Sequence, residues 1–471
     1  MKIPLLTHYA PLLLGYLLPP DAPEPTATVS FAPRHAFAQG GARGFANANA
    51  APSLLLHDAE GVSFLTEEGS DALTIRTRPT VIRRAKRRPP HMLSWAQAAR
   101  AARVATANYS GWAAPTFAED DDTWEDVEID APDMTDRQTV LALAKLSANA
   151  YSVPESDGWY ELPGFNATVP FGWEPDADGL RGHIFADDTN STVIIAIKGT
   201  SAGVLGSGGP TSKNDKFNDN LMFSCCCARV DFSWSTVCDC HAGGYKCKQS
   251  CLEDALIEDS VYATVGTNLY NNLTYLYPNA NIWLTGHSLG GGLAALIGNA
   301  FGAPAVGFEA PGDRLPSRRL HLPGPPAISP ELSGITHVYH TADPIPMGAC
   351  TGTYSGCYAA GFALESKCHV GQTILYDTVT VKGWSVDIRT HRISEVITKV
   401  LTDPWPVGDE EWDEDEDEDG WLAWWGWGRK GKKGDGDKDK GGKDKHGGVP
   451  KARPDIDCVD CYKWEFADEF D

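Results

Sequence analysis

Long apolar runs are scarce in this sequence of 471 residues. After the first 18 residues, no stretch has the roughly 20 consecutive apolar residues that a membrane-spanning helix needs. The sequence therefore excludes a protein that crosses the membrane many times. The length is compatible with one large α/β domain with appendages, or with two to three small domains.

The cysteine spacing of a zinc site is also missing. Seven of the twelve cysteines fall between positions 225 and 251, and no two of these seven have the C-x-x-C spacing of structural zinc sites. Cysteine-rich segments without metal are typical of oxidising compartments, where they form disulfides. We therefore predict disulfides, no bound metal and no other cofactor, while the pairing stays open. The seven are Cys225, Cys226, Cys227, Cys238, Cys240, Cys247 and Cys251.

Two further features indicate the secretory pathway. Four sequons are candidates for glycosylation, at Asn108, Asn166, Asn190 and Asn272. Residues 1–20 combine Lys2 with a mostly apolar run that two prolines and a histidine interrupt. This segment is expected to be either a cleaved signal peptide or a signal anchor, and an anchor would leave the rest of the chain lumenal.

Composition divides the remainder into three parts. Residues 21–135 are rich in Ala, Pro and Arg and are expected to form a partly ordered lumenal extension. Residues 136–405 alternate helix and strand patterns and are expected to form the α/β domain, with a cysteine-rich insertion at 219–251. Residues 406–471 are a low-complexity tail, expected to be disordered, that closes with a motif able to dock or to form a disulfide through Cys458 and Cys461.

Charge says little about the substrate. The net charge is −23, but ten of the eleven residues 409–419 are acidic, so much of the excess lies in the tail. A basic cluster occupies residues 83–88. Such a short run in a lumenal chain is more often a solvated segment than a nucleic-acid site, so we expect no nucleic-acid partner.

The α/β domain is organised around residues 281–292. There, an apolar strand pattern leads into Gly286-His287-Ser288-Leu289-Gly290 and then into a small-residue helix. Glycines on both sides of the serine permit a sharp turn that exposes its hydroxyl above the end of the strand. The N–H of Leu289 would face an oxyanion formed there. This pattern predicts the nucleophile of an acyl-transfer enzyme.

The nucleophile needs a base and a carboxylate, which α/β-hydrolases supply in the order Ser, Asp, His. We assign the acid to Asp343, because it follows a predicted strand at 335–340 and functional residues gather at the carboxyl ends of such strands. Weaker candidates are Asp313, Asp377 and Asp387.

Two histidines compete for the base. His369 precedes, and His391 follows, a predicted β-ribbon of residues 373–380 and 384–388. We prefer His391, because it lies on a loop that enters the last helix and can reach the serine from the edge of the sheet. Thr200 follows the predicted strand 191–197 at the place where hydrolases put a second oxyanion donor, so Thr200 and Leu289 are the expected oxyanion residues.

These motifs together resemble the class 3 lipases of fungi, which have the α/β-hydrolase fold. The sequence of residues 219–391, and again that of residues 460–466, is similar to the fungal autophagy-related vacuolar phospholipases. The resemblance implies an α/β-hydrolase fold with a disulfide-rich insertion in the lid region and a low-complexity C-terminal tail. It also implies Ser288 as nucleophile, Asp343 as acid, His391 as base and Thr200 as oxyanion donor.

The resemblance further implies a setting and a substrate. It implies a glycosylated type II membrane protein that travels through Golgi and multivesicular bodies to the vacuole. There it would lyse autophagic bodies by hydrolysing phospholipids, phosphatidylserine among them, and triacylglycerol. The alternatives are an esterase or peptidase acting on soluble substrates, and a catalytically silent lumenal binding protein on the same scaffold.

Overall fold

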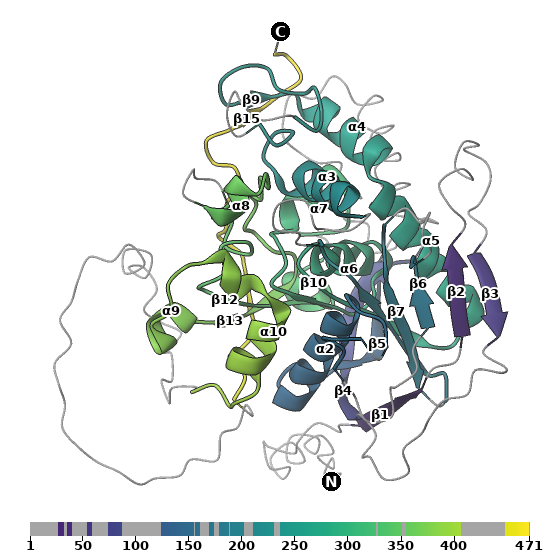
Figure 1. The fold of residues 1–471 in the computed structure, drawn as a ribbon. Helices are drawn as coiled ribbons and strands as arrows, with labels where there is room; N and C mark the ends of the chain where they lie inside the picture. The colour runs from purple at the N-terminus through teal and green to yellow at the C-terminus, as the bar shows by residue number, and fades with distance from the viewer. Residues whose placement is uncertain are drawn as a thin grey trace, which may run out of the picture.

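A mixed β-sheet runs through the centre of the protein and carries the strands that lead into the predicted site (Figure 1). The computed structural model describes residues 27–32, 35–39, 54–58, 74–86, 124–154, 156–160, 169–173, 179–187, 189–201, 211–229, 236–325, 328–350, 355–406 and 448–470. The strands of the sheet are β1 (Ala27–Ala32), β4 (Thr74–Ala85), β5 (Trp124–Pro132), β6 (Val169–Phe171), β7 (Gly182–Asp187), β8 (Thr192–Ile197), β10 (Asn281–His287), β11 (Ala305–Phe308), β12 (Ile335–His340), β13 (Gln372–Tyr376) and β14 (Arg453–Pro454). Their order is β14-β13-β12-β11-β10-β8-β7-β1-β4-β5, and β6 pairs with β7.

Helices cover both faces of the sheet, and two small sheets lie outside it. The helices are α2 (Arg137–Asn149), α3 (Ser212–Phe223), α4 (Gln249–Asp259), α5 (Val261–Leu276), α6 (Leu289–Phe301), α7 (Arg314–Arg319), α8 (Gly356–Ala359), α9 (Thr378–Lys382) and α10 (Ile393–Val396). Two 3-10 turns, η3 (Pro330–Leu332) and η4 (Ile388–His391), and a π-helical turn, η5 (Ile397–Leu401), complete them. The small sheets pair β2 (His35–Gln39) with β3 (Leu54–Asp58), and β9 (Lys246–Cys247) with β15 (Glu465–Phe466).

Strands β8, β10, β11, β12 and β13 run parallel and form the middle of the sheet. Parallel strands are covered on both faces, and so they are apolar along their whole length. In β8, Val193 and Ile195 pack in the core with α5 and α6, whereas Ile194 and Ala196 pack in the core with α2 and η5. Because the strands are parallel, their carboxyl ends meet at one edge, where the predicted site residues follow them.

The antiparallel side of the sheet is built partly by residues before position 135. Strands β4 and β5 form a hairpin that joins the sheet through β1. Two arginines of the basic cluster lie on β4: Arg83 pairs with Asp126 at 2.6 Å, and Arg84 pairs with Glu125 at 2.7 Å. These two cations are therefore matched by acids on the neighbouring strand.

Two sequence-based element assignments are wrong. The β-ribbon predicted over 373–380 and 384–388 does not form, because β13 ends at Tyr376 and α9 begins. The Asp377 carboxylate accepts a hydrogen bond from the N–H of Thr380 at 3.0 Å and caps α9, which then ends at Gly383 with φ 65°. The amphipathic pattern from residue 252 to about 275 predicts one helix, but the structure has two, since Ser260 ends α4 and caps α5.

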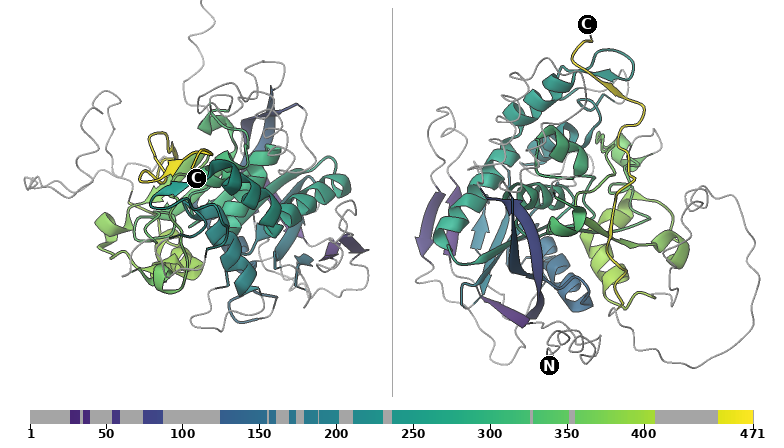
Figure 2. Two further views of the ribbon diagram at one scale, coloured as in Figure 1. Left: turned by 90° about the horizontal axis from the view of Figure 1, so that it is seen from above. Right: turned by 180° about the vertical axis from the view of Figure 1, so that it is seen from behind.

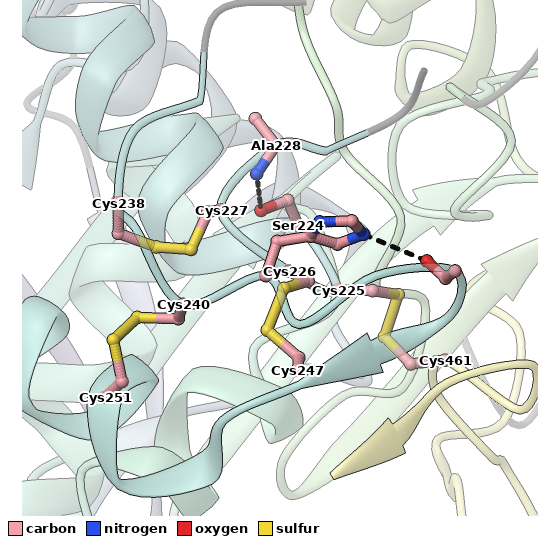
Figure 3. The surroundings of a disulfide bond; sticks show 12 residues. Ser224, Cys225, Cys226, Cys227, Ala228, Cys238, Cys240, Cys247, Cys251 and Cys461 are labelled. Carbon is pink, nitrogen blue, oxygen red and sulfur yellow. Dashed lines mark hydrogen bonds between the residues drawn. A yellow bond between two sulfur atoms is a disulfide. The ribbon is translucent and has the colours of Figure 1, made fainter. Parts of the chain in front are cut away.

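All twelve cysteines form disulfides, as the sequence predicts. The pairs are Cys225–Cys461, Cys226–Cys247, Cys227–Cys238, Cys240–Cys251, Cys350–Cys357 and Cys368–Cys458. Figure 3 shows four of them gathered around residues 224–228. Three groups of neighbouring side chains in the described residues have the proximity of metal ligands, but the cysteines in each group are already paired in disulfides.

The end of the chain returns to the domain and is held in two places. Strand β14 adds to the edge of the central sheet beside β13, and β15 pairs with β9 in the cysteine-rich region. Disulfides to Cys458 and Cys461 lie between these two strands. Figure 2 shows this segment in yellow along one side of the domain. We call residues 448–470 the C-terminal clasp.

Within the part of the chain that the structure describes, no helix combines the length and apolar character of a membrane span. The predicted signal segment at 1–20 and most of the low-complexity tail lie outside the described residues, as do two of the sequons, Asn108 and Asn166. Of the other two, Asn190 is exposed and Asn272 is partly exposed.

Candidate active site

Ser288 occupies the sharp turn between β10 and α6. Its backbone has φ 58° and ψ −131°, a conformation that is strained for a residue with a side chain. The Ser288 N–H donates to the carbonyl of Phe308 at 2.9 Å, while the Ser288 carbonyl accepts from Gly291 and Gly292. The turn is therefore bonded both to the neighbouring strand and to the first turn of the helix.

The glycines around Ser288 are required by close backbone contacts. A Cβ atom on Gly286 would lie 2.4 Å from the backbone of Gly290, and one on Gly290 would lie 2.2 Å from the carbonyl oxygen of Ile197. Backbone atoms cannot move aside as a flexible side chain can. Glycine at both positions therefore lets α6 begin directly against the ends of β8 and β10.

Three of the predicted site residues are joined by hydrogen bonds. The Ser288 Oγ lies 2.9 Å from Nε2 of His391, and Nδ1 of His391 lies 2.6 Å from Oδ2 of Asp343. With Nδ1 protonated and donating to the carboxylate, Nε2 is free to accept the serine proton. His391 comes from η4, Asp343 from the loop after β12, and Ser288 from the turn after β10.

Asp343 is held as an anion although it is fully buried. Burial by itself raises the pKa of this carboxyl, but the neighbouring His391 and the hydrogen bonds outweigh burial and bring the pKa below its usual range. One of these bonds comes from the N–H of Ile345, which donates to Oδ1 at 2.9 Å. The carboxylate is therefore fixed in position and facing the imidazole.

His287, next to the serine, fixes the backbone of the candidate base. Its Nε2 donates to the carbonyl of His391 at 2.8 Å, and its Nδ1 accepts from the hydroxyl of Tyr151 at 2.8 Å. Burial lowers the pKa of His287 to about 3, with a smaller effect from His391, so its imidazole stays neutral. Neither His287 nor Tyr151 carries a sequence signal for this role, because their contact spans 136 positions.

The two expected oxyanion residues belong to the two chain segments that adjoin Ser288. Leu289 is the first residue of α6, where the backbone N–H groups of a helix are unpaired by the helix itself. Thr200 follows β8, and the intervening Gly199 is so close that a Cβ there would lie 3.0 Å from the Cβ of Ser288. The loop after β8 therefore packs directly against the serine turn.

The side chains of α3 anchor this loop. The Thr200 hydroxyl donates to Asp219, and the N–H of Ser201 donates to Asp215 at 2.9 Å. Asp215 also pairs with Lys198 at 3.2 Å. Burial raises the pKa of Asp219 to about 8 against the opposing hydrogen bond from Thr200. Sequence analysis missed both aspartates; their signal is that α3 buries a polar face, which is unusual for a helix.

The other sequence candidates lie in different surroundings. His369 is buried with its Nε2 3.1 Å from the carbonyl of Ala310, and it makes no contact with Ser288. Asp313 lies 3.2 Å from His337, Asp377 caps α9, and Asp387 pairs with Arg389. Among the described histidines, His391 has its ring nitrogen at hydrogen-bond distance from the Ser288 hydroxyl.

Sequence comparisons show which family the chain belongs to. Residues 209–303 match the family described as Lipase (class 3). A protein of Cryptococcus neoformans var. neoformans serotype D, named "Putative lipase ATG15", is 57% identical to this chain over an alignment of 524 positions. The alignment covers 99% of this chain and 100% of the relative. The chain belongs to the class 3 lipase family. As a member of that family it is a carboxylic ester hydrolase.

Other relatives and solved structures extend the comparison. Two relatives also named "Putative lipase ATG15", from Mycosarcoma maydis and Saccharomyces cerevisiae, are 47% and 45% identical to this chain. The matches cover 74% and 69% of this chain, and 69% and 61% of the relatives' own length. The crystal structure of the Lip2 lipase from Yarrowia lipolytica matches 50% of this chain and 76% of its own at 17% identity, with a TM-score of 0.29. The expected α/β-hydrolase lipase fold with a disulfide-rich insertion is confirmed.

Proposed function

We propose that this lipase hydrolyses the ester bonds of membrane phospholipids, phosphatidylserine among them, and of triacylglycerol. Ser288 is the nucleophile, His391 the general base and Asp343 the residue that orients the base. The observation that carries the proposal is the continuous hydrogen-bonded chain from the Ser288 hydroxyl through the His391 imidazole to the Asp343 carboxylate.

In the first step, the Ser288 Oγ attacks the ester carbonyl carbon while its proton moves to Nε2 of His391. The tetrahedral intermediate then collapses, the alcohol part of the lipid leaves with the proton from His391, and an acyl-serine remains. A water molecule, deprotonated by His391, releases the fatty acid and restores the serine. Asp343 stabilises the imidazolium in both steps and stays ionised.

The oxyanion of each tetrahedral intermediate is stabilised by the backbone N–H groups of Thr200 and Leu289. Donors of this kind act strongly because they are fixed before the reaction, and loss of one such donor typically costs about 10² to 10³ in rate. The bond from the Thr200 hydroxyl to Asp219 supports the assignment, because it holds the loop after β8 in place.

A lipid substrate is supported by the surface that leads to the candidate base. Val379, Val381 and Val386 are each exposed, with 38%, 48% and 57% of their surface accessible. They lie in the segment immediately before His391, together with the exposed side chain of Arg389. Exposed apolar side chains suit contact with a membrane surface. The disulfide-rich residues 219–251 then correspond to the lid region.

The cellular setting is part of the proposal. The role that we propose is lysis of vesicles in the vacuole during autophagy, and the name ATG15 of the fungal relatives supports the link to autophagy. In this setting, residues 1–20 are a membrane anchor or signal peptide, residues 136–405 are the lipase domain, and the chain is glycosylated and passes through Golgi and multivesicular bodies. The six disulfides support passage through an oxidising compartment.

The experiment compares three substrates for the purified full chain and its Ser288→Ala variant: phosphatidylserine vesicles, a triolein emulsion and p-nitrophenyl butyrate in solution. We expect the wild-type protein to release fatty acid from the vesicles and the emulsion, and the variant to release none. Hydrolysis of only the soluble ester would replace the phospholipase proposal with a soluble esterase. Equal hydrolysis by the folded variant would remove Ser288 from the mechanism.

A further inference from the structure

A second buried carboxyl group lies behind the catalytic aspartate. Glu309 directly follows β11, the strand between the serine strand β10 and the aspartate strand β12. It is fully buried, and its backbone has φ 45°, in the left-handed region that residues with side chains rarely adopt. The strained turn directs a glutamate into the space between the two strand ends, at the cost of backbone energy.

The Glu309 carboxyl lies beside the carboxyl of Asp343: its Oε2 accepts from the N–H of His340 at 3.4 Å, three residues before Asp343, and the two carboxyl groups are close enough to share a hydrogen bond. Two carboxylates cannot form such a bond, because neither has a proton to donate and two buried like charges repel. One of the two groups must therefore be a neutral carboxylic acid. The geometry decides which of them carries the proton.

Asp343 has the better partners for a negative charge. It accepts from Nδ1 of His391 at 2.6 Å and from the N–H of Ile345 at 2.9 Å. Glu309 receives one long bond, from the N–H of His340 at 3.4 Å, and its Oε1 has no donor. The pKa of Glu309 is accordingly raised well above its usual value, by burial first and then by the charge of Asp343.

His340 does not supply a positive charge to Glu309. Its Nε2 is 3.8 Å from Oε1 of Glu309 but 3.2 Å from the carbonyl of Thr390, to which it donates. Its Nδ1 lies 3.2 Å from the hydroxyl of Thr378. Burial lowers the pKa of His340, so it stays neutral. The other titratable groups near Glu309 are Asp343 itself and Tyr339, and neither is a cation.

We propose that Glu309 is a positioning residue for ester hydrolysis: a neutral carboxylic acid that donates its O–H to Asp343 and holds this carboxylate facing His391. This inference rests on the proposed roles of Ser288, His391 and Asp343. With Glu309, the Asp343 carboxylate accepts from three donors, which belong to His391, Ile345 and Glu309. These donors fix the position of the carboxylate and lower its affinity for a proton. The O–H therefore keeps the proton shared between His391 and Asp343 on the imidazole.

The test compares two variants of similar length in the full chain. Glu309→Gln keeps a neutral donor that can reach Asp343, and Glu309→Met fills a similar volume without a donor. Turnover of p-nitrophenyl butyrate gives kcat and KM from pH 4 to 9. The rate at which diethyl p-nitrophenyl phosphate modifies Ser288 reports on the nucleophile without any turnover. Urea unfolding of each variant measures its stability.

We expect Glu309→Gln to keep at least about a third of the wild-type kcat and Ser288 modification rate. Glu309→Met should lose about 10-fold to 100-fold in both, with KM unchanged and with stability no lower than that of the Gln variant. These losses equal about 1.4 to 2.7 kcal/mol in barrier height. The acidic limb of the kcat/KM profile should move to higher pH in the Met variant alone, because a carboxylate that has lost a donor stabilises the imidazolium more strongly.

Equal rates and equal acidic limbs in the Gln and Met variants would overturn the inference, as would a Gln variant that is folded and as slow as the Met variant. Glu365 provides the matched control, because its carboxyl accepts from the N–H of Cys225 and makes no bond to Asp343. Its Gln and Met variants should not differ from each other in Ser288 modification. If diethyl p-nitrophenyl phosphate labels the Ser288→Ala protein as fast as the wild-type protein, the proposed role of Ser288 fails. That result is distinct from a failure of the inference about Glu309.

Discussion

The serine turn and the C-terminal clasp are held in place by different forces. Every residue of α6, which begins at the serine turn, is buried, and the helix packs against the ends of two strands. The clasp has several exposed large apolar side chains, and the small core of the cysteine-rich region beside it consists mainly of cysteines. Its disulfides join it to two separate parts of the domain.

This difference separates the part of the molecule that determines catalytic activity from the part that contributes only stability against unfolding. The serine turn is fixed by backbone contacts that are too close to admit a Cβ atom at its glycines. Its geometry therefore depends on the packed core. Disulfides act chiefly by restricting the unfolded chain, so they can stabilise a region without a large core. Changes at the serine turn should therefore alter catalysis, whereas changes at the clasp should alter stability alone.

The largest expected effect compares His391, which bonds Ser288, with His369, whose backbone N–H bonds Asp455 of the clasp. His391→Ala removes the proposed base and should lower kcat by about 10⁴-fold or more with little loss of stability. His369→Ala should keep kcat within about 3-fold but should unfold more easily, because it removes a buried imidazole that bonds the carbonyl of Ala310 and stacks on Tyr339. Ester turnover and urea unfolding of both variants measure these effects, and the reverse ranking of the two activities would refute the assignment of the base.

Gly290 of the serine turn and Gly243 of the cysteine-rich region beside the clasp give the next comparison. Gly290→Ala should destabilise the protein by about 3 kcal/mol or more and abolish activity, because the new methyl group would lie 2.2 Å from the carbonyl oxygen of Ile197. Gly243→Ala, in the cysteine-rich region, meets no atom within 4 Å. Its cost should be only about 1 kcal/mol, from its φ of 92°. Similar melting temperatures for the two variants would contradict this account of the serine turn.

Removal of the disulfide between Cys225 and Cys461 tests the clasp. The double replacement of these cysteines by serine should lower the free energy of unfolding by roughly 2–4 kcal/mol and leave soluble-ester turnover within about 3-fold of wild type. The matched control replaces Cys350 and Cys357, which are separated by 7 positions instead of 236, and should cost less. A large loss of kcat without loss of stability would give the clasp a role in the chemistry.

Buried histidines make stability depend on pH. Burial lowers the pKa of His183 to about 4. Below pH 6.5 the unfolded chain binds a proton at this position that the folded protein does not, so stability falls as the pH falls from 6.5 to about 4. His183→Gln should remove up to about 3 kcal/mol of this dependence. Urea unfolding at pH 4, 5 and 6.5 measures it, and an unchanged slope in the variant would show that other groups cause the acid sensitivity.

Local patterns in the sequence predicted the serine turn, because its glycines and apolar strand are consecutive. The predicted ribbon was wrong because the cap that Asp377 gives to α9 outweighs the strand preference of the valines that follow. Contacts between distant positions could not be read in this way. Cys225 and Cys461 are 236 positions apart, and Glu309 meets Asp343 only because their strands are neighbours.

The central claim is that one serine is activated by His391, and covalent labelling of the full chain tests it most directly. Diethyl p-nitrophenyl phosphate transfers its diethylphosphoryl group to an activated serine and releases p-nitrophenol, and peptide mass mapping locates the product. The account predicts one modified residue, Ser288, with labelling absent in Ser288→Ala and slowed by about 10³-fold or more in His391→Ala. Stoichiometric labelling of another residue, or rapid labelling of Ser288 without His391, would contradict it.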